Sequence, residues 1–483
     1  MTAQKQKIIL IISTCFLILL FFLLSASIVV LIRQSLQKGA EIFVAEYQTT
    51  KLKVDASSNV GFVEPVWAAI SQGGEEAGGM LTGTEELIEQ VNPKYIRLDH
   101  IFDDDYYGVY SSGTLEWSKL DKEVESMIAM GAKPFFSLSY FPKAISSTKI
   151  DVPYDWGKWS WLVEQIIKHY SGEKGIEDIY YEVWNEPDLE SFGSWKYYGD
   201  KSYLTLYDYS ARGALNARNA GVKSFKIGGP AITALYANWV TSLTNYCNQN
   251  GLPLDFISWH RYAYSPTTFI QDLGNARAWA GGRELVISEW GPDPGKTAIY
   301  SGYYSAAHAV AVVSKMIEKL NLGFLFEVKD GPSQGDYGWG LLTHNNAGLK
   351  AKPRYYALSL IKDMIGSRLD VSGEGSNIYA WAVGNQENIK LILSNFAVAG
   401  ANEEEFPIVF TNLKSGEYRI QWESLQSDDG NKVVKTNRKN EIAQKAILKA
   451  NDVMKVKITL LKQIKNNNNE SGSDSGLGRI VND

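Results

Sequence analysis

Two glutamates in this sequence each come directly after a short apolar run of the kind that forms a buried strand. Glu186 lies in Tyr-Glu-Val-Trp-Asn-Glu-Pro, residues 181–187, and Glu289 lies in Val-Ile-Ser-Glu-Trp, residues 286–290. A pair of carboxyl groups can hydrolyse a glycosidic bond with retention when one protonates the leaving oxygen and the other, about 5 to 5.5 Å away, attacks the anomeric carbon. The two glutamates therefore predict a retaining glycoside hydrolase that works by double displacement.

The residues around Glu186 favour this chemistry over a structural role. Asn185 offers an amide that can hydrogen-bond the sugar 2-hydroxyl, and Pro187 ends the strand because it has no backbone N–H. A carboxylate at a strand end can also cap a helix or pair with an arginine, and Ser-Glu-Trp around Glu289 is short enough to occur by chance. As an interacting pair, Glu186 is expected to hold the proton and Glu289 to stay ionised.

The elements that must position these residues follow a repeating pattern. From about residue 59, short β-branched and aromatic runs alternate with amphipathic segments, which is typical of βα units. An open doubly wound sheet would normally carry a glycine-rich phosphate turn, which is not found here. The sequence therefore predicts a (β/α)8 barrel over 56–365, with Glu186 after the fourth strand and Glu289 ending the seventh.

The eight predicted strands are Gly61–Trp67, Tyr95–Asp99, Pro134–Leu138, Ile179–Trp184, Phe225–Gly228, Phe256–Trp259, Leu285–Ser288 and Gly323–Phe326. Helical spacing of apolar residues between the runs predicts helices at Trp159–Tyr170, Tyr203–Asn219, Ala237–Asn250 and Tyr304–Leu320.

After Tyr355–Ile365, the last predicted barrel helix, the helical period stops and short alternating strands follow. These predict a β-sandwich over 366–462, with strands Ile378–Val383, Ile389–Asn395, Phe406–Phe410, Tyr418–Trp422 and Val453–Leu460. Residues 40–54 also look extended, so the stalk at 33–55 is a candidate further strand of that sandwich. Residues 463–483 have little apolar content and are expected to be disordered.

An uncharged apolar stretch at residues 8–32 is long enough, at about 1.5 Å per helical residue, to cross a hydrocarbon core of about 30 Å. A cleaved signal peptide has an apolar region of only about 7 to 15 residues. The stretch therefore predicts an uncleaved single-pass transmembrane helix, with residues 1–7 in the cytoplasm and the rest of the chain outside it.

Charge and cysteine content set further bounds. The chain has 48 lysines and arginines against 54 aspartates and glutamates, a net charge of −6, which gives no reason to expect a nucleic-acid partner. Cys15 lies in the apolar stretch and Cys247 in the globular part, so no structural disulfide is expected between them. The expected partners are a carbohydrate substrate and the membrane, and the sequence leaves the oligomeric state open.

Several further stretches, in order between about Gly61 and Ile365, form a recognisable set with the Glu186 motif. They are Gly-Phe-Val-Glu-Pro (61–65), Tyr-Ile-Arg-Leu-Asp-His (95–100), Gly-Ala-Lys-Pro-Phe-Phe-Ser-Leu (131–138), Phe-Ile-Ser-Trp-His-Arg-Tyr (256–262), Gly-Trp-Gly-Leu-Leu-Thr (338–343) and Lys-Pro-Arg-Tyr-Tyr-Ala (352–357). With these stretches the chain resembles the retaining (β/α) barrel glycosidases, and glycoside hydrolase family 39 in particular. That family includes β-xylosidases, α-L-iduronidases and exopolysaccharide-cleaving glycosidases.

The resemblance implies roles for several residues at strand ends. Glu186 would be the acid/base and Glu289 the nucleophile, the roles also expected of them as an interacting pair. Asn185, His260 and Tyr262 would line the subsite that holds the reacting sugar.

Two positions in the same region depart from the family. Asp99 stands where a histidine is usual and Phe326 where a tryptophan is usual, so the resemblance does not carry over the sugar specificity. Arg97, near the end of the second strand, is expected to orient the carboxylates. Trp290 and Trp339 follow strand ends and are predicted to lie in the cleft, where a ring can pack on a sugar.

Neither a metal nor another cofactor is predicted. His100 with the acids at 103–105 offers ligand atoms, but contiguous acids in a polar loop are usually solvated, and double displacement needs no metal. The alternative function is a catalytically inactive, membrane-anchored carbohydrate-binding or cell-surface interaction protein on the same barrel. Such a protein has no need for two carboxylates that repel each other.

Overall fold

The computed structural model describes residues 47–332 and 337–464. The predicted transmembrane stretch 8–32, the short segment 1–7 before it and nearly all of the predicted tail 463–483 lie outside the described residues. Within the described ranges, no helix combines the length and apolar character needed to cross a bilayer.

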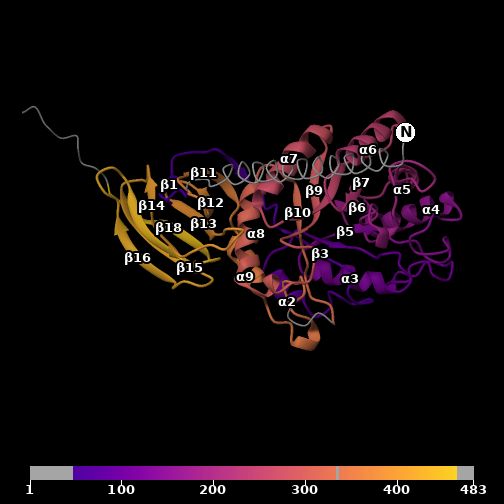
Figure 1. Ribbon diagram of the computed structural model, residues 1–483, viewed down its shortest axis with the longest axis horizontal. Helices are drawn as coiled ribbons and strands as arrows, with labels where there is room; N and C mark the ends of the chain where they lie inside the picture. Colours follow the sequence, from indigo (N-terminus) through magenta and orange to yellow (C-terminus); the bar gives the residue numbers. More distant parts are fainter. Residues whose placement is uncertain (1–46, 333–336, 465–483) are drawn as a thin grey trace, which may run out of the picture. The chain divides into compact units, whose positions relative to one another are not determined.

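A closed barrel of eight parallel strands forms the first part of the fold, as the sequence predicts (Figure 1). Its strands pair in the order β10-β3-β4-β5-β6-β7-β8-β9, which closes the ring between β9 and β10. The strands are β3 (Ala69–Gln72), β4 (Tyr95–Leu98), β5 (Lys133–Leu138), β6 (Ile179–Val183), β7 (Phe225–Ile232), β8 (Phe256–Tyr262), β9 (Glu284–Gly291) and β10 (Leu322–Phe326).

The prediction that Gly61–Trp67 forms the first barrel strand is wrong. Only Gly61–Val63 is extended, as β2, and it pairs antiparallel with β11 (Gly366–Ser372) outside the barrel. Pro65 interrupts the run, and proline cannot donate a hydrogen bond within a central strand. Phe62 is 53% exposed, which a central barrel strand would not allow. The barrel begins instead at the fully buried Ala69–Gln72.

Helices surround the barrel: α2 (Glu85–Glu89), α3 (Ser118–Ala129), α4 (Trp156–Ile167), α5 (Tyr203–Asn219), α6 (Ala237–Asn250), α7 (Pro266–Trp279), α8 (Tyr303–Met316) and α9 (Pro353–Ile361). The bounds of α5 and α6 are those predicted from helical spacing. A left-handed Gly251 ends α6, and the Ser265 side chain caps the N-terminus of α7, where Pro266 occupies the first turn.

The C-terminal part is one hydrogen-bonded sheet of ten strands. Its order is β16-β15-β18-β13-β12-β11-β1-β14-β17, with β2 paired beside β11. The strands not yet given are β1 (Leu52–Asp55), β12 (Ile378–Gly384), β13 (Asn388–Asn395), β14 (Glu404–Thr411), β15 (Gly416–Ser424), β16 (Gly430–Lys435), β17 (Ile442–Leu448) and β18 (Val453–Gln463). Strands β11, β16 and β17 were not predicted from the sequence.

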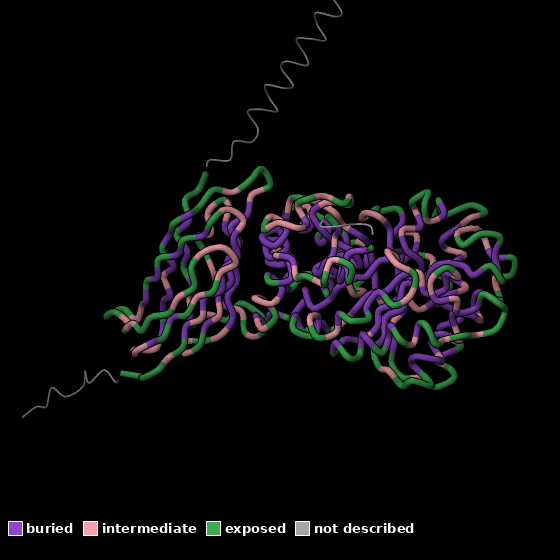
Figure 2. The backbone as a smooth tube through the Cα atoms, turned by 90° about the horizontal axis from the view of Figure 1, so that it is seen from below, coloured by how far each residue is buried: buried purple, intermediate pink, exposed green. Residues whose placement is uncertain are grey.

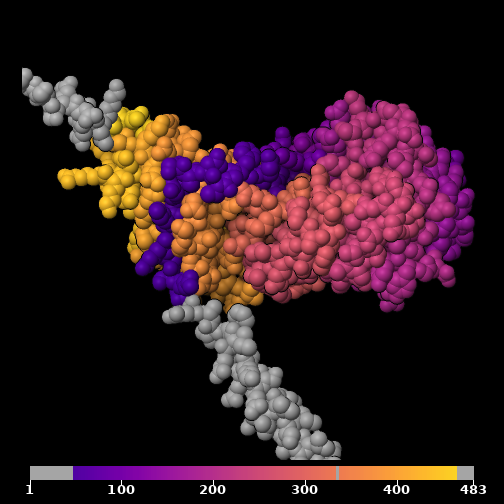
Figure 3. Space-filling model, turned by 90° about the horizontal axis from the view of Figure 1, so that it is seen from above, coloured from indigo at the N-terminus to yellow at the C-terminus, as the bar shows by residue number. Residues whose placement is uncertain are grey.

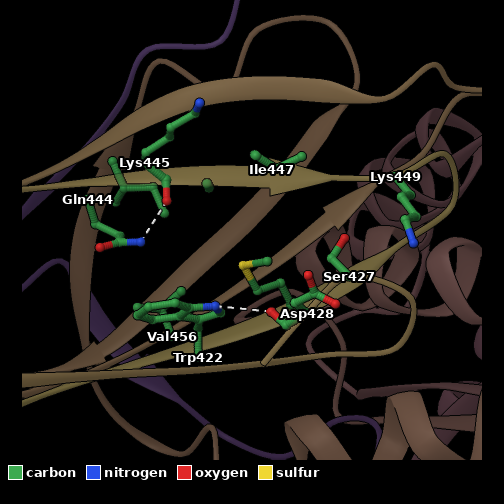
Figure 4. A pocket seen from close by; sticks show the side chains of 11 residues that line it. Trp422, Ser427, Asp428, Gln444, Lys445, Ile447, Lys449 and Val456 are labelled. Atoms are coloured by element: carbon green, nitrogen blue, oxygen red, sulfur yellow. Dashed lines mark hydrogen bonds between the residues drawn. The ribbon is translucent and has the colours of Figure 1, made fainter. Parts of the chain in front are cut away.

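Strand β1 lies inside this sheet, where it pairs parallel with β14 and antiparallel with β11. In Figure 3 the described residues nearest the N-terminus, in indigo, lie against the orange C-terminal strands. The two ends of the sheet share one apolar core, and a cavity of about 280 Å³ opens there between Trp422 of β15 and Gln444 of β17 (Figure 4). None of the predicted site residues lines that cavity.

Aromatic rings fill the half of the barrel interior that lies toward the N-terminal ends of the strands. Phe135, Tyr180, Phe256 and Phe324 from four strands form one buried cluster, with Phe135 and Phe324 centred 4.6 Å apart. The buried backbone in Figure 2 runs through the barrel, and exposed residues gather in its connecting loops. Since this end is solid, polar groups that face inward must gather at the opposite, C-terminal end of the strands.

Two helix glycines allow a matched test of this packing. An added methyl at Gly213 of α5 would lie 2.2 Å from the Ser160 carbonyl oxygen of α4, whereas at Gly274 of α7 it would meet nothing within 4 Å. Gly213→Ala is therefore expected to lower the free energy of unfolding by about 1 to 3 kcal/mol. Gly274→Ala is expected to raise it by about 0.4 to 1 kcal/mol. Denaturant unfolding followed by tryptophan fluorescence checks both, and a shift of the same sign in the two variants would contradict the packing.

Candidate active site

Both glutamates lie at the C-terminal end of the barrel. Glu289 lies two residues before the end of β9, and Glu186 lies three residues beyond β6. The backbone bends sharply before Glu186, because Trp184 has a φ of 73° and Glu186 a φ of 43°. Such left-handed conformations cost energy for residues other than glycine and are often found at functional sites. The backbone N–H of Glu186 donates to the Ala231 carbonyl oxygen at 2.9 Å, which holds the bend against β7.

His260, at the end of β8, lies between the two carboxylates. Its Nδ1 is 2.9 Å from Glu186 Oε1 and 3.4 Å from Glu289 Oε2. A carboxylate oxygen of Glu186 lies within 4.8 Å of one of Glu289. Retaining glycosidases separate their carboxyl groups by about 5 to 5.5 Å and inverting ones by about 6.5 to 9.5 Å, so the close approach of these oxygens favours the retaining class.

Arg97 is buried beneath the two acids and is the most connected residue of the site. Its Nη1 donates to Glu289 Oε1 at 2.9 Å, its Nη2 to Asn185 Oδ1 at 2.7 Å and its Nε to Glu182 Oε2 at 2.8 Å. The sequence predicts an orienting role for Arg97 but did not single out Glu182. A charged residue inside the apolar strand Ile179–Val183 is the signal that could have identified it, because a buried charge needs a partner.

Tyr262 and Asn185 complete the polar framework. The Tyr262 hydroxyl donates to Glu289 Oε2 at 2.9 Å, so both oxygens of this carboxylate accept a hydrogen bond from a fixed donor. Asn185 Nδ2 donates to the Tyr140 hydroxyl at 3.2 Å. Tyr140 was not among the predicted site residues, since nothing in its local sequence distinguishes it from a core tyrosine.

A cavity of about 630 Å³ opens above these groups. Seven of the predicted site residues line it: Asp99, Asn185, Glu186, Tyr262, Glu289, Phe326 and Trp339. Arg97 and His260 are fully buried behind this lining. Lining residues that the sequence analysis did not predict include Gly73, Glu75, His100, Phe192 and Thr233. They come from loops whose folding cannot be read from local periodicity.

Trp290 does not line the cavity, so its predicted place in the cleft is wrong. Its side chain is fully buried and packs at its ring edge against Phe269 of α7, with His308 of α8 nearby. The register of β9 against both neighbouring strands shifts near Ser288. A bulge of this kind interrupts the alternation of side chains, so that Glu289 faces the mouth and Trp290 faces the helices.

The buried charges act on each other. Burial raises the pKa of the Glu289 carboxyl, and the charge of Glu186 adds to this rise, while His260 and Arg97 oppose it. Burial alone would lower the pKa of His260, but the charges of Glu289 and Glu186 outweigh it and the pKa is raised. The imidazolium form of His260 is therefore favoured between the two carboxylates.

Glu327, directly after β10, is a further buried acid close to the cavity. Its Oε2 accepts from Gln72 Nε2 at 3.0 Å and from the N–H of Gly73, a lining residue, at 3.3 Å. Burial first, then the charge of Glu75, raises the pKa of Glu327 well above its usual range. This favours a neutral carboxylic acid at that position.

Glu186, His260 and Glu289 are also the kinds of side chain that hold divalent cations. The Arg97 guanidinium, 2.9 Å from Glu289, already supplies a positive charge there and disfavours a second one. His100 and Asp103, which the sequence analysis weighed as metal ligands, instead bond each other at 3.0 Å.

Comparisons with known proteins agree with this geometry. Residues 50–281 match the family described as glycosyl hydrolases family 39. A β-xylosidase of Caldicellulosiruptor saccharolyticus is 29% identical over 359 residues, which are 64% of this chain and 70% of that protein. A β-xylosidase of Geobacillus stearothermophilus is 30% identical over 198 residues, 36% of this chain and 37% of that protein.

Solved structures share the fold. A monomeric β-xylosidase from Caulobacter crescentus CB15 superposes with a TM-score of 0.71 at 19% identity, over 86% of this chain and all of that one. A family 39 enzyme from Xanthomonas axonopodis pv. citri gives a TM-score of 0.70 at 17% identity, over 86% of this chain and 98% of that one. The fold and the match define a glycoside hydrolase. The chain contains a glycoside hydrolase family 39 domain at residues 50–281.

The hydrogen bond from Tyr262 to Glu289 gives a pH prediction. As the expected nucleophile, Glu289 must be ionised, so activity is expected to be lost as the pH falls through its raised pKa. Tyr262→Phe removes a donor to the ionised form, which raises that pKa further. The acidic limb of kcat/KM is expected to move to higher pH by about half to one unit. Tyr264→Phe, at an exposed hydroxyl bonded to Asp293, is the control and should leave the limb in place.

Proposed function

We propose that the chain hydrolyses O-glycosidic bonds of external oligo- or polysaccharide with retention, with Glu186 as acid/base and Glu289 as nucleophile. The observation that carries this proposal is the spacing of the two carboxylates, whose ligand oxygens lie within 4.8 Å of each other across His260. That spacing leaves no room for the water molecule that an inverting enzyme places between its general base and the anomeric carbon.

The first step forms a covalent intermediate. A Glu289 oxygen attacks the anomeric carbon while the bond to the leaving oxygen breaks, and Glu186 gives its proton to that oxygen. In the second step, Glu186 takes a proton from water as the water oxygen attacks the anomeric carbon, and Glu289 leaves as a carboxylate. The two residues return to their starting states.

The surroundings of the two acids support this division of roles. Glu289 accepts hydrogen bonds from Arg97 and Tyr262, which stabilise the ionised form that a nucleophile requires. The Glu186 side chain is 15% exposed against 8% for Glu289, so Glu186 is the one more open to a leaving group and to water.

Asn185 is suited to the sugar 2-hydroxyl. Its Oδ1 accepts from Arg97 and its Nδ2 donates to Tyr140, so the amide is fixed at the cavity wall beside Glu186. An amide nitrogen carries two hydrogens, so one remains for a sugar oxygen. The two curated relatives are β-xylosidases, which supports a β-glycoside as the substrate class.

Two glutamine variants separate the roles. Glu289→Gln is expected to lower kcat by about 10⁴-fold or more on every aryl glycoside, because no covalent intermediate forms. Glu186→Gln is expected to lower kcat by about 10² to 10⁴-fold on substrates with poor leaving groups. On a dinitrophenyl glycoside, whose leaving group needs no proton, the rate of the first step should fall far less. A burst of dinitrophenol is therefore expected before slow turnover.

The first-formed anomer, followed by NMR, is the independent measurement for this mechanism. Retention is expected, and an inverted product would exclude double displacement. Normal turnover by Glu289→Gln would remove that residue from the mechanism.

We also propose that residues 8–32 anchor the protein in a membrane with the barrel outside the cytoplasm. The length of this uncharged apolar stretch supports the proposal. Deleting residues 8–32 is expected to move the protein from the carbonate-washed membrane fraction to the soluble fraction, with kcat on an aryl glycoside unchanged. Protease added to intact cells should digest the full-length barrel. An unchanged distribution after the deletion would contradict the anchor, and a protected barrel would contradict its placement.

A further inference from the structure

Four segments bring carboxylates to the wall of the cavity at the barrel mouth. Glu75, Asp99, Glu186 and Glu289 line it, and the lining residues that the structure describes include neither lysine nor arginine. The proposed reaction uses Glu186 and Glu289 only. Asp99, one residue beyond β4, is a buried acid for which the reaction has no use.

The Asp99 carboxylate is a hydrogen-bond acceptor that lacks a donor among the described residues. Its side chain is only 6% exposed, and its Oδ1 is buried without a hydrogen-bond partner among the described residues. Its Oδ2 is 3.8 Å from His100 Nε2, which is too long for a hydrogen bond. The Nδ1 of that histidine is bonded to Asp103 instead. Leaving a buried carboxylate oxygen unsatisfied is costly, so a ligand donor at this point would be favoured.

The neighbouring cations are already paired. Arg97 donates to four acceptors beneath the cavity, and His260 lies between Glu186 and Glu289. Lys296 lies 3.4 Å from Glu75 at the rim, and Lys149 lies 2.9 Å from Asp103. Within the described part of the chain, these contacts leave the cavity lining acidic. A negatively charged group on a ligand would therefore meet like charges in a partly buried, low-dielectric site.

We propose that Asp99 is a specificity-determining residue that accepts a hydrogen bond from a hydroxyl of the reacting sugar and excludes sugars that carry a carboxylate. The inference rests on the proposed function, because it assigns the sugar class for the same cavity. Neutral glycosides would supply the hydrogen-bond donor that Asp99 lacks. Uronides would instead add a negative charge beside three or more carboxylates.

Binding measurements test this without turnover. Thioglycosides in matched pairs, glucoside with glucuronide and galactoside with galacturonide, differ only at C6 and resist hydrolysis. Calorimetry with the wild-type protein is expected to show the neutral member of at least one pair binding about 100-fold or more tightly than its uronide.

Asp99→Asn keeps the shape of the side chain and removes its charge. In this variant, the ratio of the affinity for the neutral sugar to the affinity for its uronide is expected to fall by about tenfold or more. Asp105→Asn is the matched control, since that side chain is 65% exposed on the following loop and pairs with Lys143, and it should leave the ratio unchanged. Thermal unfolding of both variants shows whether they fold like the wild type.

Three results would overturn the proposal: equal binding of the two members in every pair, a ratio that Asp99→Asn does not change, or binding of the uronides alone. The proposal would also be overturned if the protein bound neither the neutral thioglycosides of the two pairs nor a thioxyloside. Because these measurements need no catalysis, they fail independently of the glutamine variants and the anomer measurement that test the proposed reaction.

Discussion

The arrangement of the active site depends on one buried guanidinium. Arg97 on β4 bonds Glu182 on β6, Asn185 just after β6 and Glu289 on β9. A buried charge network is stable only when its members are in good geometry and their hydrogen-bonding capacity is satisfied. The planar fork of arginine therefore fixes the positions of two strands on opposite sides of β4 relative to each other, and with them the nucleophile and the amide beside the acid/base.

This network works because the barrel separates apolar from polar packing along its axis. The aromatic cluster around Phe135 and Phe324 closes the half toward the N-terminal ends of the strands, so water reaches the carboxylates only from the mouth. Charges held in such a setting interact more strongly than in water, and preorganised donors stabilise charge that develops during a reaction. The same setting explains why His260 and Glu289 perturb each other's protonation.

The sequence was sufficient for the barrel, the place of both glutamates and seven of the fifteen residues that line the cavity, because strand periodicity and the Glu186 motif are local signals. Three features needed the tertiary structure. Gly61–Val63 has the composition of a strand, and only its partner decides to which sheet it belongs. The edge strand Gly430–Lys435 is mostly exposed and polar, so it carries no alternating pattern. The register shift in β9 turns Trp290 away from the mouth, and bulges have no reliable signature in a single sequence.

The C-terminal sheet has a consequence for the order in which the protein folds. Strand β1 at Leu52–Asp55 pairs with β11 and with β14 at Glu404–Thr411, more than 300 residues later in the chain. During synthesis β1 is made before the barrel, yet its first partner, β11, follows only after the whole barrel, and its second partner, β14, follows after β12 and β13. Along the chain, the barrel thus lies between β1 and the remaining strands of the sheet to which β1 belongs. The sheet can be completed only after the barrel has been made.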